Sequence, residues 1–217
     1  MEGFIFPPAI DNPAVATETS FMDSEEAWLR LKSGNERFVM GQPVHPHETH
    51  EWRRQLVHGG RPFATVLGCS DPSAPPELLF DQGLGDLFVI RVAGNVIAPD
   101  VLGSVQFAGA HLGTRLFVVL GHEGCHTVRA ALDHQVGKSR QAGRIETVVR
   151  LILPALTGLA TEGEAEQQLA AAVEANVRYA VRQIAEMPEA RKAVREQRVK
   201  VVGAVAETRT GRVRWLE

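Results

Sequence analysis

The sequence predicts an α/β fold with a mainly parallel central β-sheet, flanked by helices and completed by a C-terminal strand hairpin. Three short apolar runs, at residues 63–68, 87–92 and 115–120, lack polar alternation and are rich in β-branched side chains. Strands that are buried on both faces of a parallel sheet have this pattern. Helix-like segments separate the runs, and alternation of strands with helices indicates parallel βαβ units.

The helices and the hairpin follow from local patterns. Asp23 is a typical N-cap residue with Glu26 at capping-box spacing, so a helix is expected from there to Gly41. Apolar residues at three- and four-residue steps predict a long helix over 164–186. Shorter helical segments are expected around residues 75–82 and 104–111, and a hairpin from the runs 199–205 and 212–215.

The composition indicates one globular domain. The chain has 217 residues, of which 44% are hydrophobic and 23% charged, so it can bury a substantial core. No internal repeat or linker is apparent. Residues 1–22, which contain three prolines, are expected to form an irregular N-terminal arm, disordered or laid across a partner subunit, and residues 23–217 a single domain.

Charge and hydropathy limit the partners and the location. The net charge of −3 shows no basic surplus, which makes nucleic acid and anionic membranes poor partners. No apolar run approaches the 18 residues of a membrane span. The acidic, proline-broken start does not have the pattern of a signal peptide. We therefore expect a cytoplasmic location, where the two cysteines are reduced thiols.

Both cysteines lie in segments that could form a metal site. Cys69 follows the first buried strand, and the third strand leads into G121-H-E-G-C125. Parallel sheets place ligand sites at the carboxyl ends of their strands, so Cys69, His122 and Cys125 can meet there. A Cys₂His set suits a zinc ion with one open coordination position. The alternative is that the cysteines are buried core residues, because cysteine is among the most buried residue types.

The chain resembles the β-class carbonic anhydrases over residues 34–205. Matching stretches include G34-N-E-R-F38, P62-F-A-T-V-L-G-C69, P75-P-E-L-L-F-D-Q-G-L-G-D-L-F-V-I-R-V-A-G-N95, L112-G-T-R-L-F-V-V-L-G-H122 and V201-V-G-A-V205. The resemblance implies a Zn²⁺ cofactor bound by Cys69, His122 and Cys125. It further implies reversible hydration of carbon dioxide to bicarbonate, and a homodimer or tetramer.

The same resemblance gives Asp71 a catalytic role and exposes a departure. The family aspartate at this place accepts a hydrogen bond from the zinc-bound water, or moves in to bind the metal itself. An arginine two residues later normally holds it away from the metal through a charge-assisted pair, but this chain has Ser73 there. Ser73 supplies a neutral hydrogen bond only, so Asp71 is expected to favour the metal more strongly than in relatives. Pro72 removes a backbone donor from the same turn.

Other polar residues carry weaker expectations. His126 stands where the family usually has glycine and is either a surface residue or a proton shuttle, and Arg91 is a possible substitute partner for Asp71. The remaining histidines are interpreted as an exposed proline turn or as structural residues: His45, His47, His50, His58, His111 and His134.

Three functions therefore compete. The first is an active zinc carbonic anhydrase. The second is a hydrolase of carbonyl sulfide or carbon disulfide that uses the same zinc ligands. The third is a zinc protein with a binding or regulatory role, whose fourth metal position is closed by Asp71.

Overall fold

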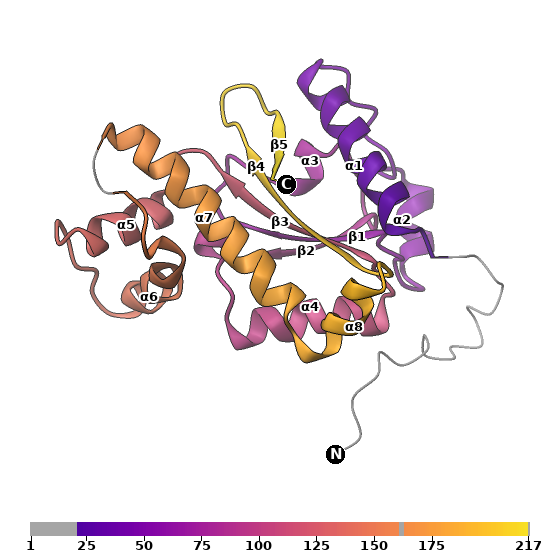
Figure 1. Ribbon diagram of the computed structural model, residues 1–217. Helices are drawn as coiled ribbons and strands as arrows, with labels where there is room; N and C mark the ends of the chain where they lie inside the picture. The colour runs from indigo at the N-terminus through magenta and orange to yellow at the C-terminus, as the bar shows by residue number, and fades with distance from the viewer. Residues whose placement is uncertain (1–20, 161–162, 217) are drawn as a thin grey trace.

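A five-stranded sheet forms the centre of the molecule, with strand order β2-β1-β3-β4-β5 (Figure 1). The computed structural model describes residues 21–160 and 163–216. The first four strands in this order run parallel, and β5 is antiparallel to β4. The predicted sheet and hairpin are thus confirmed. The strands are β1 (Ala64–Gly68), β2 (Leu87–Arg91), β3 (Leu116–His122), β4 (Lys200–Ala206) and β5 (Val213–Leu216).

Burial of the strands follows their place in the sheet. Every residue of β1 and β3 is buried, because each of these strands has a neighbour on both sides and helices on both faces. Strand β2 is at the edge, and its residues are only half-buried, with Arg91 exposed. The expectation that all three apolar runs are buried on both faces is therefore wrong for β2, whose sequence does not differ in kind from that of an inner strand.

Helices cover the two faces of the sheet unequally. One face packs against the core formed mainly by α4, α5, α6, α7 and α8, whereas α1 and α3 cover the other face; Figure 1 shows α1 and α3 above the strands and α4 and α8 below them. The helices are α1 (Ser24–Val39), α2 (His50–Leu56), α3 (Pro76–Leu79), α4 (Pro99–His111), α5 (His126–Gln135), α6 (Arg144–Leu156), α7 (Ala165–Ala185) and α8 (Pro188–Arg195), with a 3-10 turn at Ala93–Asn95.

The close approach of α7 to the sheet depends on two glycines. A Cβ atom at Gly121 would lie 2.7 Å from a methyl group of Val177, and one at Gly203 would lie 2.8 Å from the other methyl group. These distances are too short for a real contact, so a side chain at either glycine would push the helix away. The glycines therefore set the distance at which α7 packs over β3 and β4.

Local capping explains where the first helix starts. The Asp23 carboxylate accepts hydrogen bonds from the backbone N–H groups of Glu25 and Glu26, each at 2.8 Å, as an N-cap does. The helix ends before Gly41, which has φ of 67°. Both predicted ends are thus confirmed, as are the long helix over α7 and the helix that contains residues 104–111.

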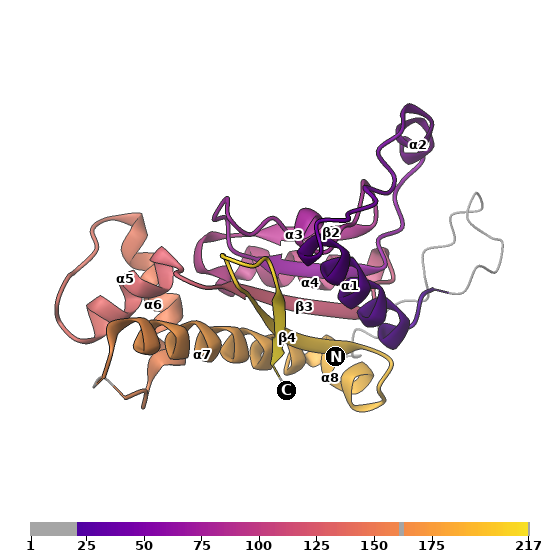
Figure 2. The same cartoon turned by 90° about the horizontal axis from the view of Figure 1, so that it is seen from above.

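Three helices were not expected from the sequence. Helix α2 has no buried residue and projects from the body (Figure 2), so it lacks the apolar stripe on which helix prediction depends. Helix α6 contains Pro154 near its end. Helix α8 is only eight residues long. The segment expected around residues 75–82 is helical only from Pro76 to Leu79.

Residues 1–20 of the predicted N-terminal arm lie outside the described residues. Within the described chain, none of the helices combines the length and the apolarity that crossing a membrane requires.

Candidate metal centre

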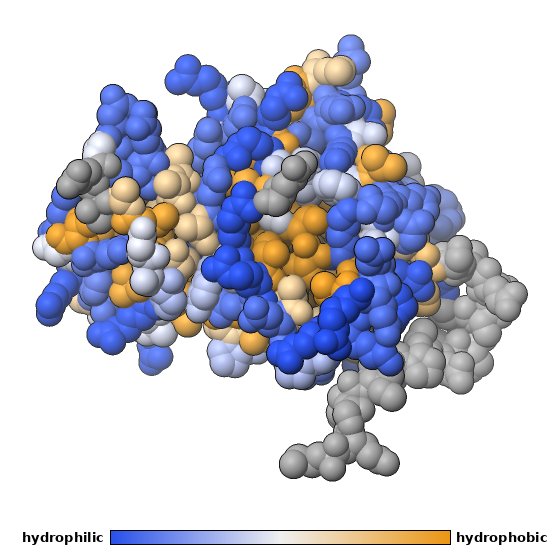
Figure 3. All heavy atoms as spheres, in the orientation of Figure 1, coloured by the Kyte–Doolittle hydropathy of each residue, from blue (hydrophilic) through white to orange (hydrophobic). Residues whose placement is uncertain are grey.

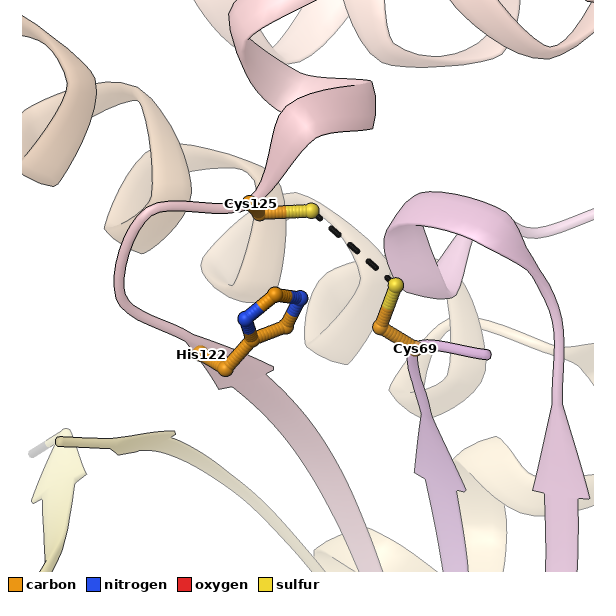
Figure 4. A group of neighbouring side chains, drawn as sticks. All are labelled: Cys69, His122 and Cys125. Carbon is orange, nitrogen blue, oxygen red and sulfur yellow. Dashed lines mark hydrogen bonds between the residues drawn. The ribbon is translucent and has the colours of Figure 1, made fainter. Parts of the chain in front are cut away.

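Three chain segments bring the candidate ligands together at the carboxyl end of the sheet. Cys69 is the first residue after β1, and His122 is the last residue of β3. These strands are parallel neighbours, with Gly68 opposite Leu120, so residues far apart in the sequence become adjacent. Cys125 caps the start of α5, after a turn that Gly124 makes with φ of 70°. Figure 4 shows the three side chains converging on one point from these segments.

The geometry of the three side chains fits a zinc ion. Their ligand atoms all lie within 4.8 Å of one another, and the two Sγ atoms are 4.0 Å apart. Tetrahedral coordination with Zn–S bonds of about 2.3 Å requires sulfur atoms about 3.8 Å apart. All three residues are almost fully buried, with exposed fractions of 4% for Cys69 and 2% for His122 and Cys125. Among the described residues, no other group of this kind exists.

The imidazole of His122 is oriented for metal binding. Its Nδ1 lies 3.0 Å from the carbonyl oxygen of Glu123; a carbonyl only accepts, so Nδ1 carries the proton. Nε2 is buried and has no hydrogen-bond partner in the described part of the chain. A buried nitrogen without a partner is costly unless something binds it. The backbone contact thus fixes the tautomer and leaves a lone pair directed at the cysteines.

Cys125, His122 and two backbone amides together stabilise the thiolate form of Cys69. The N–H groups of Asp71 and Gly94 donate to Sγ at 3.4 and 3.3 Å. The hydrogen bond with Cys125, helped by His122 and these amides, outweighs burial and lowers the pKa of Cys69 to about 4. Sharing a proton with Cys69 raises the pKa of the Cys125 thiol well above its usual range. Burial lowers the pKa of His122, but its contact with the Cys69 thiolate raises the pKa by more. The net result is a raised pKa.

Asp71 faces Ser73 in the described structure. Its Oδ1 accepts hydrogen bonds from the Ser73 backbone N–H at 2.9 Å and from the Ser73 hydroxyl at 2.6 Å. The hydroxyl contact, followed by the backbone contact, lowers the pKa of the Asp71 carboxyl. Ser73 thus supplies two donors where one was expected. The carboxylate is not part of the group of ligand atoms around the candidate metal position.

Arg91 holds the ligand loop through its backbone. Its Nε donates to the carbonyl of Cys69 at 2.9 Å, and its Nη2 donates to the carbonyl of Asp71 at 2.6 Å. In the described structure Arg91 therefore positions the loop and does not pair with the Asp71 carboxylate. His126 is exposed at the first position of α5, and its role stays a prediction.

Sequence reasoning missed a buried support behind Cys69. Asn176 on α7 donates from Nδ2 to the carbonyl of Gly94 at 2.9 Å, and the N–H of Gly94 binds the Cys69 sulfur. Gly94 has φ of 67°, in the left-handed region that favours glycine. The signal was a polar residue on the apolar stripe of a helix, which is rare unless it has a buried partner.

The histidine-rich turn is not part of any group of three possible metal ligands in the part of the chain that the structure describes. His47 lies 2.8 Å from a carboxylate oxygen of Asp86 and stacks on Trp52. His111 packs against Phe107. The contact of His111 agrees with its interpretation as a structural residue, whereas His47, which was expected in an exposed turn, is half-buried.

Comparison with known proteins identifies the family. The family model described as carbonic anhydrase matches residues 64–213. Carbonic anhydrase 2 of Mycobacterium tuberculosis is 43% identical over 147 residues, which cover 65% of this chain and 71% of that protein. A carbonic anhydrase of Mycolicibacterium smegmatis is 44% identical over 147 residues, which also cover 65% of this chain and 71% of that protein. The chain belongs to the β-carbonic anhydrase family.

Solved structures agree with this assignment at the level of the fold. A tetrameric β-carbonic anhydrase from Sordaria macrospora superposes with a TM-score of 0.71 at 22% identity, over 85% of this chain and 93% of that one. A β-carbonic anhydrase of Aspergillus fumigatus gives a TM-score of 0.70 at 22% identity, over 89% and 90% of the two chains. The predicted fold class and family are thus confirmed.

Proposed function

We propose that this member of the β-carbonic anhydrase family hydrates carbon dioxide reversibly to bicarbonate, with Zn²⁺ bound by Cys69, His122 and Cys125. The observation that carries the proposal is the buried, unpartnered Nε2 of His122 facing two cysteine sulfurs. Curated relatives at 43–44% identity are named carbonic anhydrases, which supports this reaction over an unrelated one.

The bound zinc would supply hydroxide at neutral pH, because it lowers the pKa of a water molecule from 15.7 to near 7. The chain itself sets up the site. Backbone amides of Asp71 and Gly94 stabilise the Cys69 thiolate, and the Glu123 carbonyl fixes the tautomer of His122. Arg91 ties the loop between Cys69 and Asp71 to the end of β2.

Asp71 would orient the reacting hydroxyl group. Both donors of Ser73 bind Oδ1, and no described residue donates to Oδ2. Oδ2 can therefore accept a hydrogen bond from the nucleophile. The lowered pKa of Asp71 keeps the carboxylate ionised at neutral pH. Ser73 would therefore do part of the work for which relatives use an arginine.

The alternatives differ at this carboxylate. A closed site requires Asp71 among the metal ligands, and its orientation toward Ser73 supports an open site instead. Hydrolysis of carbonyl sulfide or carbon disulfide would use the same ligands, and no contact in the described structure favours it. The tetrameric relative from Sordaria macrospora supports a homodimer or tetramer. The cytoplasmic location stays a prediction.

A stopped-flow assay of carbon dioxide hydration tests the proposal. The zinc-loaded protein, with metal content measured, is compared with chelator-treated protein and with carbonyl sulfide as a second substrate. We expect carbon dioxide hydration that disappears with the metal and returns with added Zn²⁺. Zinc-loaded protein with no hydration activity would refute the proposal. Preferential turnover of carbonyl sulfide would show that carbonyl sulfide, rather than carbon dioxide, is the substrate.

A further inference from the structure

The hairpin of β4 and β5 binds the residue that follows His122. Glu123 comes directly after β3, and its N–H donates to the carbonyl of Ala206, the last residue of β4, at 2.9 Å. Ala206 is also the register partner of His122. The pairing of β3 with β4 therefore continues through Glu123, before the chain turns toward Cys125.

Thr208, in the turn of this hairpin, binds Glu123 twice. Its N–H donates to Oε2 of the Glu123 carboxylate at 3.2 Å, and its hydroxyl donates to the Glu123 carbonyl at 3.3 Å. The same carbonyl accepts from Nδ1 of His122 at 3.0 Å. A carbonyl oxygen has two lone pairs, so it can accept both hydrogen bonds. The Thr208 hydroxyl and the His122 imidazole are thus linked through a single oxygen atom.

The turn that carries Thr208 is closed by hydrogen bonds of its own. The N–H of Glu207 donates to the carbonyl of Arg212, and the N–H of Gly211 donates to the carbonyl of Glu207, each at 2.8 Å. The Thr210 hydroxyl donates to the Glu207 carboxylate at 2.7 Å. The turn lies at the surface among mainly hydrophilic residues (Figure 3). Because these bonds order the turn, Thr208 loses little conformational entropy when it binds Glu123.

A buried asparagine fastens the turn to the body of the protein. Asn35 on α1 is 5% exposed, and its Nδ2 donates to the carbonyls of Leu79 and Gly211 at 2.9 and 2.8 Å. Its Oδ1 accepts from the N–H of Val213 at 2.8 Å. Both ends of the turn are therefore connected to α1, and through Leu79 to the end of α3. A continuous set of hydrogen bonds and covalent links leads from α1 through the turn to Glu123 and His122.

The contacts of Thr208 distinguish positioning of His122 from stabilisation of the hairpin alone. Its N–H and its hydroxyl both bind Glu123, outside the hairpin. The turn itself is closed by Glu207, Thr210 and Gly211 without the Thr208 hydroxyl. Removing that hydroxyl therefore leaves the hairpin closed and changes only what the Glu123 carbonyl accepts.

We propose that Thr208 is a positioning residue for His122. Its hydroxyl holds the Glu123 carbonyl in the direction that keeps the proton on Nδ1 and leaves Nε2 free to bind the metal. This inference rests on the part of the proposed function that assigns His122 to zinc. Partners that orient a metal-bound histidine directly change metal affinity about 10- to 100-fold. Thr208 acts one contact further away and is exposed, so its effect is smaller.

The Zn²⁺ dissociation constant of the full-length chain, measured by competition with a chelator, tests this role. We expect Thr208→Ala to weaken zinc binding about two- to fivefold, as the loss of one exposed neutral hydrogen bond predicts. Thr208→Ser keeps the hydroxyl and should bind zinc like the unmodified chain. Thr157→Ala, at an exposed threonine that ends α6, should also leave the affinity unchanged. Equal affinity for Thr208→Ala and the unmodified chain, or an equal loss in Thr208→Ser, would overturn the proposal.

The Nδ1 proton of His122 gives a second readout, which a purely structural role of Thr208 would not change. Its exchange with solvent is followed by nuclear magnetic resonance in zinc-loaded protein with ¹⁵N-labelled histidine. We expect exchange about two- to fivefold faster in Thr208→Ala, with the backbone amides of β1 unchanged, and the original rate in Thr208→Ser. Unchanged exchange in Thr208→Ala contradicts the role of Thr208 alone. An unmodified chain that binds no zinc would instead refute the proposed function, and this role with it.

Discussion

Replacing Ser73 with alanine tests how Asp71 is held beside the three candidate ligands. The change removes the 2.6 Å hydroxyl contact to Oδ1 and keeps the 2.9 Å backbone contact. A hydrogen bond to a charged group contributes about 1.5–3 kcal/mol when buried. Ser73 is exposed, so solvent reduces this to about 1 kcal/mol. That energy corresponds to an approximately fivefold change in the population of the oriented carboxylate.

We therefore expect the Ser73→Ala protein to hydrate carbon dioxide up to about fivefold more slowly at equal zinc content. Ser73→Thr is the matched control, because it keeps the hydroxyl group and should retain nearly the full rate. Stopped-flow rates at neutral pH provide the measurement. Equal rates for the alanine, threonine and unmodified proteins would show that the hydroxyl contact does not orient Asp71.

Stability gives an independent check with a defined pH dependence. The hydroxyl lowers the folded-state pKa of Asp71 below its unfolded value of about 3.9. Its contribution is therefore complete above that value and is lost as the pH falls through the folded-state pKa. Ser73→Ala should lower the free energy of unfolding by about 1 kcal/mol at pH 7, and the difference should shrink below about pH 4. A difference that grows toward acid pH contradicts this assignment.

Three further changes test the support, the packing and the metal. Asn176→Leu leaves the buried carbonyl of Gly94 without its donor and should lower the free energy of unfolding by about 1–3 kcal/mol in urea titrations; an unchanged midpoint would refute that support. Gly121→Ala places a Cβ atom 2.7 Å from Val177 and should cost about 1–3 kcal/mol, whereas Gly103→Ala, with nothing within 4 Å, should stabilise by about 0.5–1 kcal/mol. Cys125→Ser should strongly reduce the zinc that copurifies, measured by atomic absorption, and a full complement of zinc would exclude this cysteine as a ligand.

The inner part of the fold could be predicted from the sequence because its residues obey simple patterns. The runs at β1 and β3 are continuous and apolar, and the structure buries every residue of both strands. The apolar stripe over α7 and the N-cap at Asp23 also led to correct elements. In each case the local pattern and the tertiary environment favour the same structure.

The rest could not be predicted because the deciding contacts are between distant segments or lie outside the pattern. The apolar run of β2 resembles that of an inner strand, and only the strand order shows that it is an edge. Helix α2 buries nothing, so no stripe marks it. The orientation of Asp71 depends on a backbone N–H of Ser73, and the link from Asn176 to Gly94 joins elements 82 residues apart. Asn176 stands out as a polar residue on the apolar stripe of α7, but residue types alone do not identify its partner, nor the other contacts.

The three candidate metal ligands and Asp71 are held by different parts of the fold. Cys69, His122 and Cys125 are positioned by β1, β3 and the start of α5, and all three are almost fully buried. Asp71 lies on the loop after β1, held by an exposed serine and by Arg91 at the end of the edge strand. The contacts that hold the Asp71 carboxylate are thus more exposed than the three candidate metal ligands. We therefore expect substitutions of Ser73 to change the orientation of Asp71 more than the positions of Cys69, His122 and Cys125.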